Sequence, residues 1–357
     1  MVSKKQETPA ACLGDPCDES ADPELCQAEE MAMGPELVLA PIVDTAEVEK
    51  RGFKSYRVWC SSRQNWSNDL RIFAFAFRPS GRWKPGDRPH DRALTWVMGK
   101  DDCSTPLVQP QIREDKDNKK TKRYDTEHII ELNYIPLFFE YATNGLLMSG
   151  KKSQVTPIDC KFFLPRSRKG DDVLHRNIIN DQNLFRGGMP VPRPAPRIMN
   201  ALGSNWNKAN FHLLEVQVNG MKKRKPGRAL KEIRNAIAVW HYLNNAEVKQ
   251  SFVQIERDVR TQLEITQDEW AKREDGYKVC LVDAWHEFFD DMIPYQVDRT
   301  SKWVHENIEK MTKIWAISDV DENLKKIVLG SLTRLGGFAH AITNYDLDDF
   351  HQGPDGL

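Results

Sequence analysis

The stretch Asp125–Gly145, DTEHIIELNYIPLFFEYATNG, is the most apolar part of a polar chain, and its hydrophobic period changes in the middle. Over Glu127–Leu132 the residues alternate, which predicts a strand. One face of that strand would carry His128, Ile130 and Leu132, and the other would carry Glu127, Ile129 and Glu131. Much of the N-terminal half is expected to pack around this segment.

The second half of the same stretch has a helical period. Ile135, Phe138, Phe139 and Ala142 would share one helix face, and a first helical turn tolerates Pro136. The pair Asn144-Gly145 is typical of a helix C-cap. The sequence therefore predicts a strand followed closely by a helix.

Length and composition indicate an ordinary water-soluble protein. The chain has 357 residues, 40% hydrophobic and 29% charged, with a formal net charge of −1. This length favours two domains. The balanced charge gives no general attraction to nucleic acid or membrane. The longest apolar runs are far below the ~20 residues of a membrane span, and the acidic, polar N-terminus shows no cleavable signal peptide.

The cysteines and two short motifs bear on the compartment of the protein. There are 7 cysteines, so at least one is unpaired within the monomer. The sequence contains no C-x-x-C motif, so a zinc ribbon is not supported. Asn65 begins a glycosylation sequon, Asn-Trp-Ser, and Lys50-Arg51 is a dibasic processing site. Both motifs favour secretion. The alternative interpretation is that the sequon occurs by chance and that Lys50-Arg51 is only a solvated turn.

Periodicity divides the chain into four parts. Residues 1–50 read as a disordered acidic leader or linker, 51–225 as an α+β domain, 226–345 as a helical domain and 346–357 as a frayed tail. Within 51–225 we expect strands over Tyr56–Cys60, Arg71–Arg78 and Thr95–Met98, a loop over Arg186–Arg197, and a helix from about Ala209. Phe73, Phe75 and Phe77 would line one strand face. The expected fold class is α+β, with a small strand-rich N-terminal part and an all-helical C-terminal part.

Local signals predict six helices after Pro226. Thr266 with Glu269 forms a capping box before the third, and Pro294 is expected to end the fourth. Thr300 or Ser301 would begin the fifth. Ser318 or Asp319 would cap the sixth, and Gly336-Gly337 would break it. The short connections favour antiparallel neighbours.

Several blocks in a fixed order resemble the C-terminal, post-barrel region of large fungal chitinases of glycoside hydrolase family 18, including the killer-toxin-like subgroup. The resemblance runs from Gly52 to Trp315. The blocks are YDTEHIIELNYIPLFFEYATNG, IDCKFF, RIMNALGSNWNKANFHLLEVQVNGMKKR, IRNAIAVWHYLNN and VDAWHEFFDDMI. The resemblance implies a fungal protein located extracellularly or in the cell wall, and it supplies no activity for this region.

The chain departs from that family in its catalytic machinery. Family 18 chitinases carry Asp-x-x-Asp-x-Asp-x-Glu on a barrel strand, where the Glu is the general acid. This string does not occur here, and the eight strand-helix units of a barrel are also missing from the sequence. We expect either a separate product of the C-terminal region or a gene model that has lost the barrel.

Two groups of polar residues are weak candidates for chemistry. Asp125, Glu127, His128 and Glu131 are the densest carboxylate and imidazole group, but a strand would divide them between two faces. A strand with a salt-bridged outer edge is the plainer interpretation. His286 and Asp290 are four residues apart on one helix face, so they are weak candidates for metal ligands. The alternative interpretation is that they lie on an ordinary solvent-exposed helix face. No cofactor is indicated.

Two tryptophans outside the helical stripes are weak candidates for binding. Trp66 lies in the sequon loop and Trp206 in a turn between Gly-Ser and an Asn-rich segment. Exposed aromatic rings can stack on sugars, whereas aromatic residues in turns are also often core plugs. The lysine- and arginine-rich run 222–225 suits a solvated helix end.

These observations lead to one expected function and two alternatives. The first is a non-catalytic accessory or interaction module of a chitinase-like fungal protein, with chitin or another cell-wall polysaccharide as ligand. The second is an enzyme or toxin of unknown class that uses the cluster from Asp125 to Glu131. The third is a structural spacer without a ligand.

Overall fold

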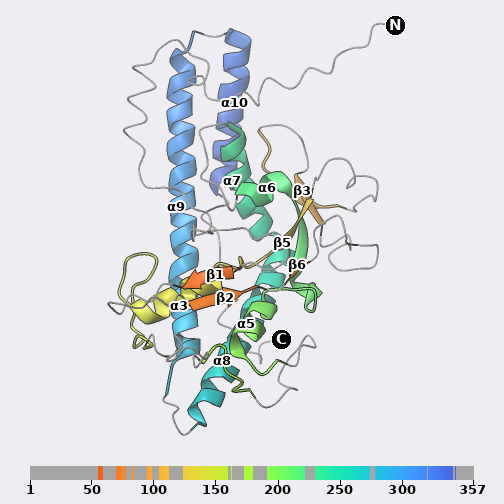
Figure 1. Cartoon of the computed structure of the whole chain (residues 1–357). Coiled ribbons are helices and arrows are strands. Elements are labelled where there is room, and N and C mark those ends of the chain that lie inside the picture. Colours follow the sequence, from red (N-terminus) through yellow and green to blue (C-terminus); the bar gives the residue numbers. More distant parts are fainter. Residues whose placement is uncertain are drawn as a thin grey trace.

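The described part of the chain is an α+β fold, as the periodicity predicts. The computed structural model describes residues 55–58, 70–74, 76–77, 83, 95–98, 104–111, 124–159, 162, 173–179, 191–221, 230–273, 278–319, 321–340 and 342. Five of the six strands in these residues come before residue 130, and long helices follow residue 230. Figure 1 shows α9 as a long spine, with α10 beside its upper part and α3 near its lower part.

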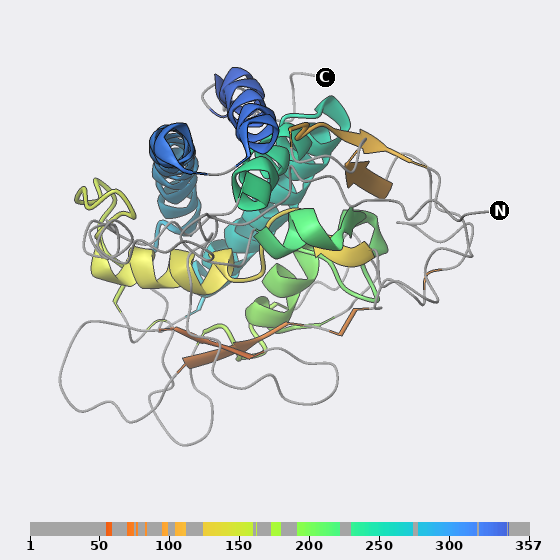
Figure 2. The same ribbon diagram turned by 90° about the horizontal axis from the view of Figure 1, so that it is seen from above.

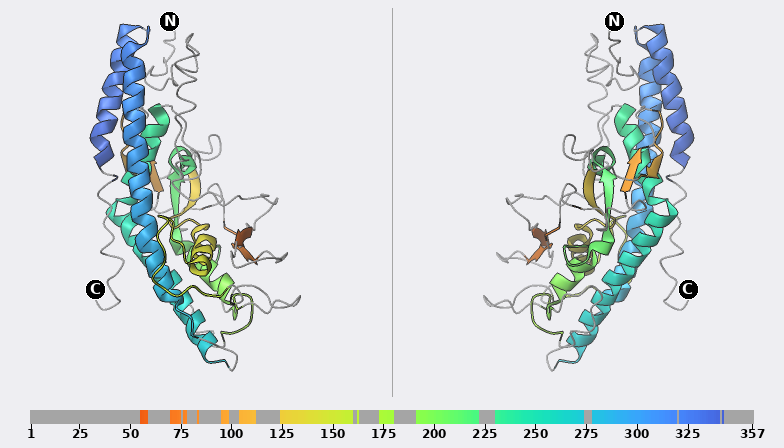
Figure 3. Two further views of the ribbon diagram at one scale, coloured as in Figure 1. Left: turned by 90° about the vertical axis from the view of Figure 1, so that its left-hand side faces the viewer. Right: turned by 90° about the vertical axis from the view of Figure 1, so that its right-hand side faces the viewer.

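The described strands form two small sheets, one antiparallel and one mixed. β1 (Ser55–Val58) pairs with β2 (Leu70–Phe73) in a two-stranded antiparallel sheet. A four-stranded sheet has the order β4-β3-β6-β5, in which only β3 and β6 are parallel. Its strands are β3 (Thr95–Met98), β4 (Val108–Pro110), β5 (Tyr124–His128) and β6 (Phe211–Glu215). Figure 3 shows α9 and α10 along one side of the molecule and β1 and β2 toward the other.

The strand and helix predicted within Asp125–Gly145 are both present, but the strand lies three to four residues earlier than the predicted Glu127–Leu132. β5 ends at His128, and the chain bends before α3 (Tyr134–Asn144) begins. The alternation over 129–132 therefore does not reflect a strand. Gly145 ends α3 as predicted, with a left-handed φ of 62° and its N–H donating to the Tyr141 carbonyl at 2.8 Å.

The helix predicted from about Ala209 is wrong over its first turn and a half. Residues Phe211–Glu215 form β6, and only Val216–Met221 are helical, as α6. β6 lies between β3 and β5, so sheet pairing on both edges overrides the helical spacing of its apolar residues. Its first four residues are all buried, as in a central strand, and periodicity cannot distinguish such a run from a buried helix.

Two other predictions for the N-terminal part need correction. The end of the loop predicted over Arg186–Arg197 is the start of α5 (Pro194–Ala201), where Pro194 occupies the first turn. β2 ends at Phe73, so the strand predicted over Arg71–Arg78 is too long. Phe73 is 51% exposed, whereas Phe77, beyond the strand, packs against the core. Phe75 lies outside the described residues.

The helical part contains fewer and longer helices than predicted. It consists of α7 (Leu230–Leu243), α8 (Ala246–Ala271), α9 (Leu281–Ile317) and α10 (Glu322–Ala339). Thr266 is no cap: it lies inside α8 and donates to the Gln262 carbonyl at 2.6 Å. α9 continues through Pro294, so no helix begins at Thr300 or Ser301, and α10 continues through Gly336-Gly337. Packing on both sides outweighs these local breakers.

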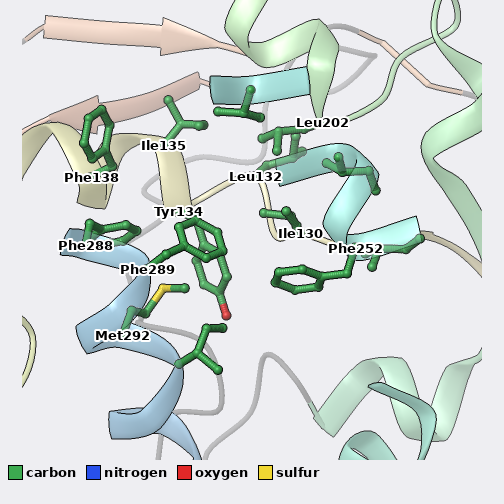
Figure 4. Packing of buried hydrophobic residues seen from close by; sticks show 14 of the residues in the cluster. Ile130, Leu132, Tyr134, Ile135, Phe138, Leu202, Phe252, Phe288, Phe289 and Met292 are labelled. Carbon is green, nitrogen blue, oxygen red and sulfur yellow. The ribbon is translucent and has the colours of Figure 1, made fainter. Parts of the chain in front are cut away.

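The larger of two hydrophobic core clusters extends through both parts of the chain. One cluster of buried residues contains members from Val58 to Ile342, on both sides of the boundary predicted near residue 225. Its centre is aromatic, where Phe138 of α3 meets Trp285 of α9 edge to face, with ring centroids 4.9 Å apart. Figure 4 shows Phe138, Phe288 and Phe289 gathered there, and Figure 2 shows α3 crossing beside α9. The exact domain limits stay a prediction.

Candidate functional site

A buried polar network joins the four-stranded sheet to α7. Glu127 of β5 lies directly opposite His212 of β6 in the strand register. The Nδ1 atom of His212 is 2.9 Å from the hydroxyl of Tyr242, which α7 supplies. Trp96 of β3 packs against both rings, with centroid distances of 6.1 Å to His212 and 5.7 Å to Tyr242. The network thus connects three strands and one helix.

Burial and two carboxylates keep the Tyr242 hydroxyl protonated. Desolvation raises the pKa of Tyr242 well above its ordinary value, and the nearby charges of Glu127 and Glu131 raise it further. The hydroxyl therefore remains available as a hydrogen-bond donor at neutral pH. His212 and Tyr242 were not predicted as site residues, because His212 lies within the segment expected to be a helix and Tyr242 lies on an ordinary amphipathic helix.

Three of the four candidate residues, Asp125, Glu127 and His128, lie on β5, where successive side chains alternate between its two faces, whereas Glu131 lies beyond the end of the strand. Glu127 and Glu131 both act on the pKa of Tyr242, so they lie on the α7 side. His128 points the other way, edge to face with Phe77 at 4.6 Å and with Phe211 at 4.7 Å. The Oδ2 atom of Asp125 accepts a 3.1 Å hydrogen bond from Asn219 of α6.

This network is internal and not a solvent-facing edge. Glu127 is 1% exposed and His128 6%, and both His212 and Tyr242 are fully buried. The interpretation of β5 as a strand with a salt-bridged outer edge is therefore wrong for Glu127. A substrate could reach these groups only if the sheet or α7 moved, so in this conformation their chemistry is to hold elements together.

A second polar centre lies around Glu287 of α9, a residue that the sequence places beside His286 in the same polar group without indicating these partners. Its carboxylate accepts hydrogen bonds from the Tyr141 hydroxyl, from the Ser153 hydroxyl at 2.5 Å and from the Gln154 N–H at 2.7 Å. One turn later, Asp291 accepts from the Ser149 N–H at 2.9 Å. These carboxylates fasten the segment after α3 to α9.

The pKa values of this centre follow from its hydrogen bonds. Burial acts to raise the pKa of Glu287, but the hydrogen bonds from Ser153, Tyr141 and the backbone N–H groups of Gln154 and Val155 outweigh burial, and the pKa is lowered. Burial, and then the hydrogen bond to Glu287, raises the pKa of Tyr141. A carboxylate with a lowered pKa is a poor proton acceptor, so the centre is suited to structural support.

The metal candidates His286 and Asp290 are not joined by a third ligand among the described residues. The Nε2 atom of His286 is 3.1 Å from a guanidinium nitrogen of Arg260 on α8. Because a guanidinium only donates, Nε2 accepts, and its lone pair is engaged there. Asp290 is exposed on the next turn of α9. Among the residues that the structure describes, no three or more His, Cys, Asp and Glu side chains are grouped to hold a metal ion.

Trp206 is presented on a firmly held turn between α5 and β6. The Ser204 hydroxyl oxygen accepts from the N–H groups of Trp206 at 2.9 Å and Asn207 at 3.2 Å, and it donates to the Asn200 side chain. The N–H of Asn205 donates to the Ala76 carbonyl at 3.0 Å. The turn is thus tied both to α5 and to the chain that follows β2.

Gly203 makes this turn possible. Its φ of +125° is strained for residues other than glycine, and a Cβ there would lie 2.8 Å from the buried Phe211 ring. On the rigid turn Trp206 remains 62% exposed. The interpretation of Trp206 as a core plug is therefore wrong. The remaining candidates, Trp66, Asn65, Lys50 and Arg51, lie outside the described residues.

Comparisons with known proteins add no relative. No protein-family model matches the sequence, and neither a curated protein nor a solved structure matches it. In the portion of the chain with a described structure, none of the helices has the length and apolar character needed to cross a membrane.

Proposed function

We propose that this chain is a non-catalytic accessory or interaction module of a chitinase-like fungal protein, acting outside the cell or in the cell wall. Its ligand is chitin or a related cell-wall polysaccharide. The observation that carries the proposal is Trp206, an indole that is 62% exposed on a turn braced from two sides. The resemblance of the sequence blocks to the post-barrel region of family 18 chitinases supplies the biological context.

Physical chemistry supports a flat, preordered ring as a sugar contact. An indole offers a large apolar face together with one N–H donor, and it has only two side-chain torsions to order on binding. The backbone that carries Trp206 is already fixed, so little loop entropy opposes binding. Asn205 next to it is also exposed and can offer an amide to sugar hydroxyls.

The test is binding of the purified full-length chain to insoluble polysaccharides. We expect the chain to sediment with chitin and with fungal cell walls, and to stay in solution with an unrelated polymer such as starch. Absence of sedimentation with chitin and with walls would contradict the proposal and favour a spacer without a ligand. Equal sedimentation with every polymer would show nonspecific adsorption and also contradict it.

A second candidate is an enzyme or toxin of unknown class. One observation favours it: Glu127, Glu131, His212 and Tyr242 gather although they come from distant parts of the sequence. Glu127→Gln keeps the size of the side chain and removes its charge. If this variant folds normally and loses a toxic or hydrolytic effect that the wild-type chain shows, the second candidate is supported. Retention of that effect would assign the network to stability.

A further inference from the structure

One turn in the middle of α9 combines several features that weaken a helix. Pro294 lies inside the 37-residue helix and has no N–H to donate to the carbonyl of Asp290. Two residues later, Gln296 is 2% exposed, and neither its Oε1 nor its Nε2 atom has a hydrogen-bond partner among the described residues. Buried amides are normally paired, so this side chain favours any rearrangement that supplies a partner.

The next turn adds a third feature. The Thr300 hydroxyl donates to the backbone carbonyl of Gln296 at 2.8 Å. A hydroxyl that bonds back to the preceding turn in this way slightly destabilises a helix and often bends it. Figure 3 shows that α9 is bowed along its length and not straight.

The two segments of α9 on either side of this turn pack against different partners. Before Pro294, Trp285 donates to the buried Glu256 of α8 at 3.1 Å, and Phe289 lies against Phe252 of α8 and Tyr134 of α3. After Pro294, α9 packs against α10, which returns antiparallel from residue 322 and itself also packs against α7.

The end of α10 lies about one helical turn beyond the weak turn. α10 has 18 residues and starts almost directly after α9 ends at Ile317. Because both helices rise about 1.5 Å per residue, the last turn of α10 comes level with roughly residue 300 of α9. Figure 1 shows α10 beside the upper part of α9 only. The weak turn therefore lies at the junction between the α10-paired segment and the segment held by α3 and α8.

We propose that the turn Pro294–Gln296 is a hinge, at which the α9–α10 hairpin bends relative to the part of α9 that α3 and α8 hold. Hinges are placed at a few residues that absorb the change in backbone angles, between bodies that stay rigid. The freed carbonyl and the buried, unpartnered amide lower the cost of opening this turn, while the rings before it and the α10 contacts after it keep both segments helical.

Hydrogen exchange of the full chain, followed by mass spectrometry, tests the hinge. In the wild type we expect a local maximum of exchange over residues 290–300 within α9. Pro294→Ala restores the missing donor and Gln296→Met replaces the amide with an apolar side chain of similar length. Each is expected to slow exchange in this window roughly tenfold without changing the ends of α9. Asp298→Asn, on the exposed side of the same turn, is the control and should leave the profile unchanged.

Three results would overturn the hinge. One is a wild-type profile in which residues 290–300 are as protected as the rest of α9, which needs no variant and so does not depend on whether a variant folds. Another is a pair of folded variants whose exchange in this window equals that of the wild type. Faster exchange in Gln296→Met would also overturn it, because it would show that the amide stabilises the turn.

Discussion

At the scale of single residues, buried polar groups do more to define this molecule than exposed ones. The His212–Tyr242 contact and the Glu127 carboxylate fix the register of β5 on β6 and the position of α7, because a slip of one residue would leave them without partners in the core. Glu287 has the corresponding role for the segment after α3.

The lowered pKa of Glu287 predicts how the stability of the fold depends on pH. Its pKa is lowered in the folded chain from an ordinary value of 4.5, so its contribution is present above that value and is lost as the pH falls through the folded pKa. Urea unfolding should show that Glu287→Gln is less stable than the wild type at about pH 7, with a smaller difference at about pH 3.5.

The control for this prediction is Glu309→Gln. Glu309 also has a lowered pKa, because of its hydrogen bond to Lys313, but that pair is exposed on α9. Exposed pairs contribute little, so this variant should leave the free energy of unfolding close to that of the wild type at either pH. A Glu287→Gln penalty that stays constant over the whole range would contradict the assigned role.

Two glycines give opposite predictions for the same substitution. Gly203→Ala should lower the free energy of unfolding by about 1–3 kcal/mol, because the left-handed backbone and the Phe211 ring both oppose a methyl group. Gly330→Ala, inside α10 with nothing within 4 Å of the new methyl, should raise it by about 0.5–1 kcal/mol. Denaturant titration measures both. A Gly203→Ala variant as stable as the wild type would show that the Trp206 turn is not held as described.

At the scale of elements, the sequence predicted where many helices exist and often misplaced their ends. Gly145 was a reliable C-cap signal because the left-handed conformation it requires is a local property. Pro294, Gly336 and Gly337 were misleading, because tertiary packing carries α9 and α10 through them. β6 was missed since its pairing partners lie far earlier in the sequence, 85 residues for Glu127 opposite His212 and 118 residues for Trp96 opposite Leu214, beyond any local pattern.

The N-cap of α10 differs between the sequence-based prediction and the structure. Sequence analysis predicted Ser318 or Asp319, whereas Asp321 accepts from the N–H groups of Asn323 at 3.1 Å and Leu324 at 3.0 Å. Asp321→Ala should therefore cost about 0.5–2 kcal/mol in the free energy of unfolding. Asp319→Ala, two residues earlier and exposed, should cost less than about 0.5 kcal/mol. Equal effects in thermal or urea unfolding would show that the cap is misassigned.

At the scale of the whole molecule, the α+β class followed from composition and periodicity, but the shared core did not. The change of pattern near residue 225 is real in the sequence, and yet Trp285 and Phe138, from opposite sides of it, meet in one cluster. The candidate site was only partly predictable. Glu127 and Trp206 could be singled out by residue type. That Glu127 is buried and Trp206 exposed depends on the packing of distant elements, which the sequence does not reveal.

The central claim is that Trp206 is a binding surface for cell-wall polysaccharide. The most direct measurement is the depletion isotherm of the full-length chain on chitin, compared for the wild type, Trp206→Ala and Ile317→Ala, which removes another exposed apolar side chain, 71% exposed at the end of α9. Loss of a central aromatic contact usually costs more than about 1–2 kcal/mol, so Trp206→Ala should bind at least about tenfold more weakly, while Ile317→Ala binds like the wild type. Wild-type affinity in a folded Trp206→Ala variant, or equal weakening in both variants, would contradict the claim.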